Sequence, residues 1–154
     1  MNRDLAAAYY KLLMAIPWEE ELVVHGIREG LNKFLSNAYL SMSPKCKHGS
    51  AHFYSLNALS AMKNGDKRGL VFDHMVPKTE YIQRPCEKAA RENRLTIEYI
   101  KYKLDNYWKI AVITATENRL LSSTKMPKGW DGIDYKARYT LANIALLPVN
   151  EANF

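Results

Sequence analysis

The sequence is poor in the features that build disulfide frameworks, thiolate metal sites and membrane spans. Its two cysteines, Cys46 and Cys86, lie far apart and form no CxxC pair, so at most one disulfide is possible and a thiolate zinc site is not supported. No window approaches the length of about 20 apolar residues that a spanning helix needs. The N-terminal residues lack the order of a secretory signal. We therefore expect reduced thiols and a cytoplasmic protein without membrane association.

Internal repeats, low-complexity tracts and linker-like stretches are also missing. The chain has 154 residues, of which 47% are hydrophobic and 25% charged, and this composition is ordinary for a globular protein that buries one core. We expect a single domain over residues 1–154, whose N-terminal part, residues 1–50, is helical. The sequence is compatible with a monomer or a dimer.

Basic residues outnumber acidic ones. The chain has 22 lysines and arginines against 16 aspartates and glutamates, a net charge of +6. This excess favours a polyanionic partner, most simply nucleic acid. Because many basic proteins bind no nucleic acid, charge alone is a modest indication.

Helical spacing of apolar residues dominates the first 50 positions. A cap at Asn2 or Asp4 predicts a helix that runs to residue 16, where Pro17 interrupts it. Pro17 and the acids that follow it are typical of a second helix start, and apolar spacing carries this helix to residue 38. Residues 41–50 are predicted to form a loop.

The central segment combines helical patterns with one short strand. Residues 52–62 are predicted as a helix that ends at the turn dipeptide Asn64-Gly65. Residues 70–72 are predicted as a strand, and residues 85–108 as a charged helix.

The last third of the chain predicts a short apolar run and two further helices. The run covers residues 111–113, and Thr114 to Glu117 fits a capping box that starts a helix. Residues 125–132 are predicted as a loop, and residues 135–146 as the last helix. The expected fold is therefore α+β and predominantly helical, with a small β-hairpin beside a helix.

The dipeptide Asp73-His74 ends an apolar strand just before Pro77. Neighbouring side chains leave a strand on opposite sides unless the backbone bends. A bend would bring the carboxylate and the imidazole to one centre, where the carboxylate binds a hard cation and the imidazole accepts a proton from water. The alternative is a hydrogen-bonded histidine at a loop edge with Asp73 as a turn residue.

Four segments together resemble the HNH, or ββα-metal, nuclease superfamily, in particular small bacterial and phage HNH-type proteins. The resemblance spans residues 52–145. The matching segments are Phe53-Tyr-Ser with Ala58, Leu70-Val-Phe-Asp-His-Met-Val-Pro-Lys78, Ile113-Thr-Ala-Thr-Glu-Asn-Arg-Leu120, and Lys125-Met-Pro-Lys-Gly-Trp-Asp131 with Ala137-Arg-Tyr139.

The resemblance implies metal-dependent cleavage of phosphodiester bonds at a ββα-metal-like site. His74 would be the general base and Asp73 a ligand of a divalent cation, most simply Mg²⁺, with Mn²⁺, Ni²⁺ or Zn²⁺ as alternatives. Asn118 would be the second catalytic residue, which orients the histidine. The helical segment at about 85–108 would be an insertion in the family pattern.

The third position of the HNH motif has several candidates, because no histidine follows His74. Glu117 is the chemically strongest metal ligand, although its place in the capping box gives it a competing structural role. The other oxygen-bearing candidates are Ser122, Asp131, Asp134 and Asn143.

A basic and aromatic set of residues is predicted to contact nucleic acid, with cations on phosphates and the aromatic ring on bases. The alternative is that the aromatic residues pack the end of the domain among solvated cations. The set consists of Lys78, Lys125, Lys128, Trp130 and Arg138.

The sequence thus favours a metal-dependent HNH-type endonuclease that hydrolyses DNA, with DNA preferred over RNA as the partner. Two other classes stay open. One is a nucleic-acid-binding or interaction domain that keeps the scaffold without catalysis, and the other is a helical protein-interaction module in which the motif is a coincidence.

Overall fold

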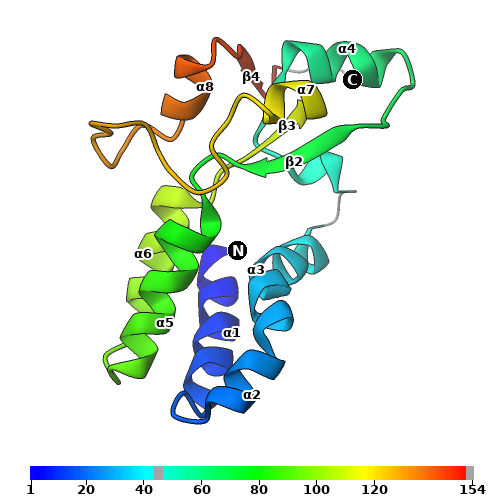
Figure 1. Ribbon diagram of the computed structural model, residues 1–154. Helices are drawn as coiled ribbons and strands as arrows, with labels where there is room; N and C mark the ends of the chain where they lie inside the picture. Colours follow the sequence, from blue (N-terminus) through cyan, green and yellow to red (C-terminus); the bar gives the residue numbers. More distant parts are fainter. Residues whose placement is uncertain (44–46, 152–154) are drawn as a thin grey trace. The chain divides into compact units, whose positions relative to one another are not determined.

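The computed structural model describes residues 1–43 and 47–151, and they belong to two compact units (Figure 1). The helical unit consists of Met1–Pro44 and Lys78–Tyr107, and the sheet unit of Lys45–Pro77 and Trp108–Phe154. The segment that the HNH pattern predicts as an insertion, at about 85–108, lies almost wholly within the helical unit. No helix among the described residues is long and apolar enough to cross a membrane.

The helical unit is built around α1, which packs against α3, α5 and α6. Its buried faces repeat at helical spacing, as Leu5, Tyr9 and Leu13 do in α1. A π-helical segment leads into α5. The elements of this unit are α1 (Asn2–Ala15), α2 (Glu21–Gly26), α3 (Arg28–Met42), the π-helical segment η2 (Thr79–Gln83), α5 (Arg84–Arg91) and α6 (Ile97–Tyr107).

The first predicted helix is confirmed, but the second is divided. Met1 occupies the cap position of α1, and neither Asn2 nor Asp4 caps it. Residues 17–20 form a turn closed by the Glu20 N–H and the Pro17 carbonyl, at 2.9 Å. The helix predicted over residues 17–38 is in fact α2 and α3, which separate at Ile27. Gly26, a weak helix former, ends α2 at this break.

The charged helix predicted over residues 85–108 is also two helices. Asn93 adopts a left-handed conformation, with φ of 52°, and terminates α5 in a Schellman motif. Its N–H bonds to the Ala90 carbonyl at 3.0 Å, and the Arg94 N–H bonds to the Ala89 carbonyl at 2.9 Å. The Thr96 hydroxyl then accepts the Tyr99 N–H at 3.1 Å and starts α6.

The sheet unit holds a four-stranded sheet in the order β2-β3-β1-β4. Strand β2 is antiparallel to β3, and β1 is parallel to β3 and antiparallel to β4. The α+β class is thereby confirmed. The antiparallel pair β2–β3 is followed directly by a short helix, although a long segment rather than a tight turn joins the two strands. The elements are the 3₁₀ turn η1 (His48–Ser50), β1 (Phe53–Ser55), α4 (Leu56–Lys63), β2 (Leu70–His74), β3 (Ile110–Thr114), α7 (Ala115–Asn118), α8 (Ala137–Leu141) and β4 (Leu146–Pro148).

Two helix predictions in this unit extended over strands. The helix predicted over residues 52–62 is wrong for its first turn, because Phe53–Ser55 pairs with β3 and β4. Ser55 ends the strand and caps α4, since its hydroxyl accepts the Ala58 N–H at 3.0 Å. The last helix, predicted over residues 135–146, is limited to Ala137–Leu141.

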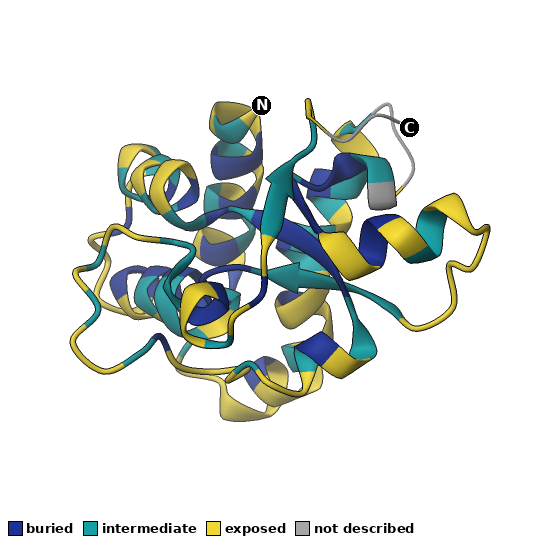
Figure 2. Ribbon diagram, turned by 90° about the horizontal axis from the view of Figure 1, so that it is seen from above, coloured by how far each residue is buried: buried dark blue, intermediate teal, exposed yellow. Residues whose placement is uncertain are grey.

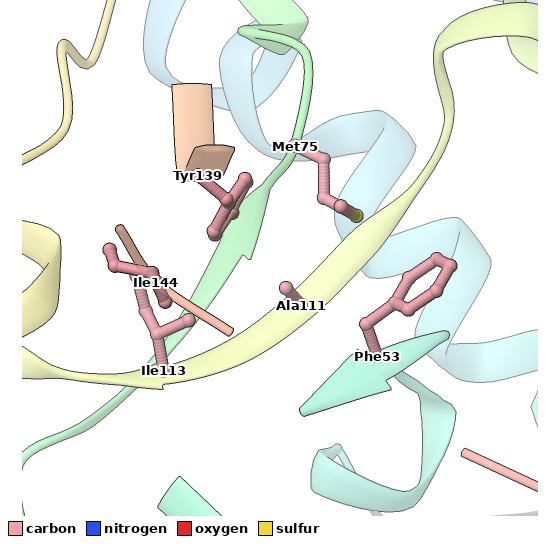
Figure 3. Close-up of a cluster of buried hydrophobic side chains, with 6 residues drawn as sticks. All are labelled: Phe53, Met75, Ala111, Ile113, Tyr139 and Ile144. Carbon is pink, nitrogen blue, oxygen red and sulfur yellow. The ribbon is translucent and has the colours of Figure 1, made fainter. Parts of the chain in front are cut away.

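Strand β3 is the centre of this unit. Its first four residues are buried, whereas β2 and β4 are half-buried (Figure 2). A core cluster lies on one face of the sheet, and Figure 3 shows its members, which come from β1, β3, α8, the residue after β2 and a residue before β4. The cluster is Phe53, Met75, Ala111, Ile113, Tyr139 and Ile144.

Candidate functional site

Asp73 and His74 lie on opposite faces of the sheet. The pairing of β2 with β3 is one-to-one through the end of the strand, with Asp73 opposite Ala111 and His74 opposite Ile110. Side chains of a regular strand alternate between faces. Met75 packs in the core cluster, so Asp73 shares that face and His74 faces away. The backbone bend that would bring both groups to one centre is not formed in β2.

The Asp73 carboxylate accepts hydrogen bonds from two consecutive residues of α8. Its Oδ2 atom accepts a bond from the Arg138 Nη2 at 2.7 Å and another from the Tyr139 hydroxyl. The side chain of Arg138 is only 3% exposed and that of Asp73 15%. A buried, hydrogen-bonded ion pair of this kind holds α8 against the end of β2.

Arg138 also bonds to three backbone carbonyls. Its Nε donates to the Met75 carbonyl at 3.0 Å, its Nη1 to the Ser122 carbonyl at 2.5 Å, and its Nη2 to the His74 carbonyl. All three nitrogens of the guanidinium are therefore bonded within the protein. The sequence predicted Arg138 as a contact for nucleic acid, whereas the structure places it in the interior, where it joins β2, α8 and the loop after α7.

Burial sets the protonation behaviour of this cluster. It raises the pKa of Asp73 above the ordinary value, against the charge of Arg138 and the hydrogen bonds from Tyr139 and Arg138, which act in the opposite direction. Burial and the neighbouring Asp73 charge raise the pKa of Tyr139. Tyr139 therefore stays protonated and remains a donor to the carboxylate.

The His74 imidazole lies among aromatic rings on the opposite face. Its centroid is 4.7 Å from the Trp108 ring, at an interplanar angle of 61°, and 6.2 Å from the Phe72 ring, at 86°. Edge-to-face contacts of this kind orient a ring by packing. The histidine is half-buried.

Glu117 organises a second polar cluster, at the other end of the β2–β3 pair. Its Oε2 accepts the Ser55 hydroxyl at 2.6 Å and the Thr114 N–H at 2.8 Å, and its Oε1 accepts the Asn57 amide at 2.9 Å. The capping box predicted from Thr114 and Glu117 is confirmed. Burial raises the pKa of Glu117, but the hydrogen bonds from Ser55, Thr114 and Asn57 together outweigh it and lower the pKa.

His74 and Asn118, the predicted catalytic pair, lie at opposite ends of the paired strands β2 and β3. Asn118 ends α7, which follows Thr114, and Thr114 pairs with Leu70. His74 is four positions after Leu70, which corresponds to about 13 Å along a strand. Asn118 is half-buried beside Glu117.

The donor groups do not fit a divalent cation in this arrangement. Both predicted metal ligands already accept hydrogen bonds within the protein, Asp73 from Arg138 and Tyr139 and Glu117 from Ser55, Asn57 and Thr114. Over residues 1–43 and 47–151, no group of three or more histidines, cysteines, aspartates and glutamates is placed to hold a metal ion. A cation at the Oδ2 atom of Asp73 would have to displace a buried guanidinium.

The remaining predicted nucleic-acid contacts differ in accessibility. The Lys78 ammonium donates to the Asn32 carbonyl at 2.7 Å and to the Ser36 hydroxyl at 3.1 Å, all within the helical unit, and burial lowers its pKa. Lys125 and Lys128 are exposed in the loop before α8. In the same loop the Trp130 indole N–H donates to the Asp134 carbonyl at 2.8 Å.

Sequence reasoning found Asp73 but not its partners, and Glu117 but only one of its roles. Tyr139 and Ser55 were visible in the segments that resemble the HNH superfamily, yet no spacing rule connected them to these acids. The chain was compared with protein-family models, with curated proteins and with solved structures, and none of them matches it.

Proposed function

We propose that this protein binds nucleic acid through its sheet unit and that the Asp73-His74 pair has a structural role there. The observation that carries the structural role of this pair is the arrangement of the two side chains at the end of β2. Asp73 and His74 diverge to opposite faces, and a buried guanidinium neutralises the carboxylate. Such a carboxylate stabilises the contact of α8 with β2, which is a structural use of the acid.

The distribution of charge supports a polyanionic partner for the sheet unit. Residues 45–77 and 108–154 contain 11 basic and 6 acidic residues, a net charge of +5, whereas the helical unit contains 11 basic and 10 acidic residues. Nearly all of the excess positive charge therefore belongs to one unit. An excess of positive charge in one unit attracts the phosphate backbone through counterion release, without any need for a metal.

A metal-dependent HNH-type endonuclease acting on DNA is the second candidate. It is favoured by one observation, the order of β2, β3 and α7 with an acid-histidine pair at the end of β2. This candidate requires Asp73, whose Oδ2 atom is bonded to Arg138 and Tyr139, to bind a cation, with His74 as the general base.

Incubation with supercoiled plasmid separates the two candidates. Native protein, His74→Ala and the control His25→Ala, which alters an exposed histidine of α2, are each incubated with Mg²⁺, Mn²⁺, Ni²⁺ or EDTA. We expect retarded plasmid in every case and no nicking. Metal-dependent nicking that His74→Ala loses and His25→Ala keeps would establish the endonuclease instead.

A further inference from the structure

Two lysines of the sheet unit rest on a pair of adjacent aromatic rings. The Lys136 ammonium is 4.7 Å from the centroid of the Phe53 ring, and the Lys109 ammonium is 6.0 Å from that of Tyr135. The two rings are themselves 5.8 Å apart. These four residues, the lysine–aromatic cluster, come from β1, from the position just before β3 and from the segment just before α8. Three separate segments thus bring two lysines onto one pair of neighbouring rings.

Neither lysine has an acidic partner among the described residues. Lys33 and Lys101, in contrast, pair with acids one turn away on their own helices. The acid nearest in sequence to Lys136 is Asp134, whose carboxylate accepts the Lys136 backbone N–H at 2.9 Å. Both lysines are half-buried, and neither ammonium is paired with a carboxylate of the described residues, so the missing counter-charge would come from a ligand. A bound anion would supply that counter-charge to both lysines at once.

The positive charge of the cluster also affects the pKa of a neighbouring histidine, His52. Burial and, secondarily, the Lys109 charge lower the pKa of His52 to about 4. The His52 ring is held in place because its Nδ1 atom accepts the Ile110 N–H at 3.2 Å. His52 is therefore neutral at pH 7 and adds no charge to the cluster, which leaves Lys109 and Lys136 as its two cations.

We propose that the lysine–aromatic cluster binds phosphates of a nucleic-acid backbone. This inference rests on the proposed function and assigns residues to it. The rings position the lysine stems and are themselves covered, since Phe53 is 9% exposed and Tyr135 half-buried. Each ring already has a lysine ammonium near it, so the charged groups that the cluster offers to a ligand are its two cations. The cluster therefore contacts phosphates without reading sequence.

The test is the salt dependence of binding to a labelled DNA duplex of arbitrary sequence, followed by fluorescence anisotropy. The Lys109→Gln/Lys136→Gln variant is compared with Lys63→Gln/Lys67→Gln, which removes two exposed lysines from the same unit. For the cluster variant we expect the negative slope of log K against log salt to become shallower by about 1.8, because each of the two lost phosphate contacts contributes about 0.9 to its magnitude. We expect affinity at 0.1 M salt to fall by at least about tenfold, and the exposed-lysine variant to stay near native. Lys109→Arg/Lys136→Arg keeps the charge and should bind nearly as native.

The outcomes distinguish this inference from the function beneath it. If the native protein binds no nucleic acid at moderate salt, the proposed function and this inference both fail. If the native protein binds and both glutamine variants weaken equally, net charge explains the binding. The same conclusion follows if the cluster variant keeps the native slope. In these last two cases the cluster is no phosphate site, while the proposed function stands.

Discussion

At the scale of single residues, Asp73 shows how the environment decides the use of a carboxylate. The sequence places it where an HNH-type protein would bind a cation, and the structure supplies a cation of another kind, the guanidinium of Arg138. A guanidinium neutralises the carboxylate and also bonds to carbonyls, which a metal ion in a catalytic site does not need to do. The ion pair consequently ties three segments of the sheet unit together.

Removal of the Asp73 carboxylate should destabilise the protein strongly. Asp73→Ala leaves Arg138 buried without its counter-ion, and breaking a buried pair in this way costs about 3–5 kcal/mol. The change in the free energy of unfolding is measured by urea denaturation. Asp66→Ala is the control, since Asp66 forms an exposed pair with Arg68 and the loss of an exposed pair should destabilise the protein far less.

Equal and small losses for the two variants would show that Asp73 is not bonded to Arg138 in solution. An Asp73→Ala protein that unfolds as the native one does would also restore Asp73 as a free ligand for a metal ion. The endonuclease hypothesis would gain from that result.

The partners of Asp73 show why this part of the site was not predictable. The Asp73-His74 dipeptide was recognisable within one short segment. Arg138 lies 65 positions further along the chain, and its partnership with Asp73 depends on α8 packing against β2. Single-sequence patterns record local spacing and carry no signal for such a contact.

At the scale of elements, the start of α7 combines a predictable and an unpredictable interaction. The capping box was readable because Thr114 and Glu117 are three positions apart, and it formed as predicted. The same Glu117 carboxylate also bonds to Ser55 and Asn57. It thereby joins α7 to the junction of β1 and α4, which no local pattern indicates.

The stabilising effect of Glu117 should depend on pH. Its pKa is lower in the folded protein than the ordinary value of 4.5, so the folded state favours the ionised form. The stabilisation is present above pH 4.5 and is lost as the pH falls through the folded-state pKa. We expect Glu117→Gln to lower the free energy of unfolding by about 1.5–3 kcal/mol at pH 7, as for hydrogen bonds to a charged group, and by less at pH 3.

Chemical denaturation of both proteins at several pH values measures this difference. A gap between native protein and Glu117→Gln that stays constant, or widens, as the pH falls would mean that the carboxylate is not ionised in its hydrogen-bonded cluster. The Asp66→Ala protein again provides the reference, because that exposed side chain is outside the cluster.

Element types were more predictable than element limits. Strand β2, predicted over residues 70–72, and helix α1 both followed from local patterns, whereas residues 111–113 were recognised only as an apolar run. Strand β1 was missed because its three residues continue smoothly into the apolar pattern of α4, and only pairing with β3 and β4 makes Phe53–Ser55 extended. The break at Asn93 had a local signal, since asparagine tolerates a left-handed backbone, but helical periodicity outweighed it.

At the scale of the whole molecule, charge and fold are divided between two units. The sheet unit carries the acid-histidine strand, the lysine–aromatic cluster and a net charge of +5. The helical unit is nearly balanced in charge. The overall net charge of +6 could be read from the sequence, whereas its assignment to one unit needed the fold, because each unit is made of two separate stretches of chain.

The central claim is that the sheet unit binds nucleic acid without a metal ion. The most direct measurement is the dissociation constant for a labelled DNA duplex in EDTA and in Mg²⁺ at matched ionic strength. The account predicts binding in EDTA at least as tight as in Mg²⁺, since Mg²⁺ only competes for phosphates, and an intact duplex at the end of each titration. Binding that requires Mg²⁺, or a duplex cut in its presence, would contradict the account and return Asp73 and His74 to a metal-dependent active site.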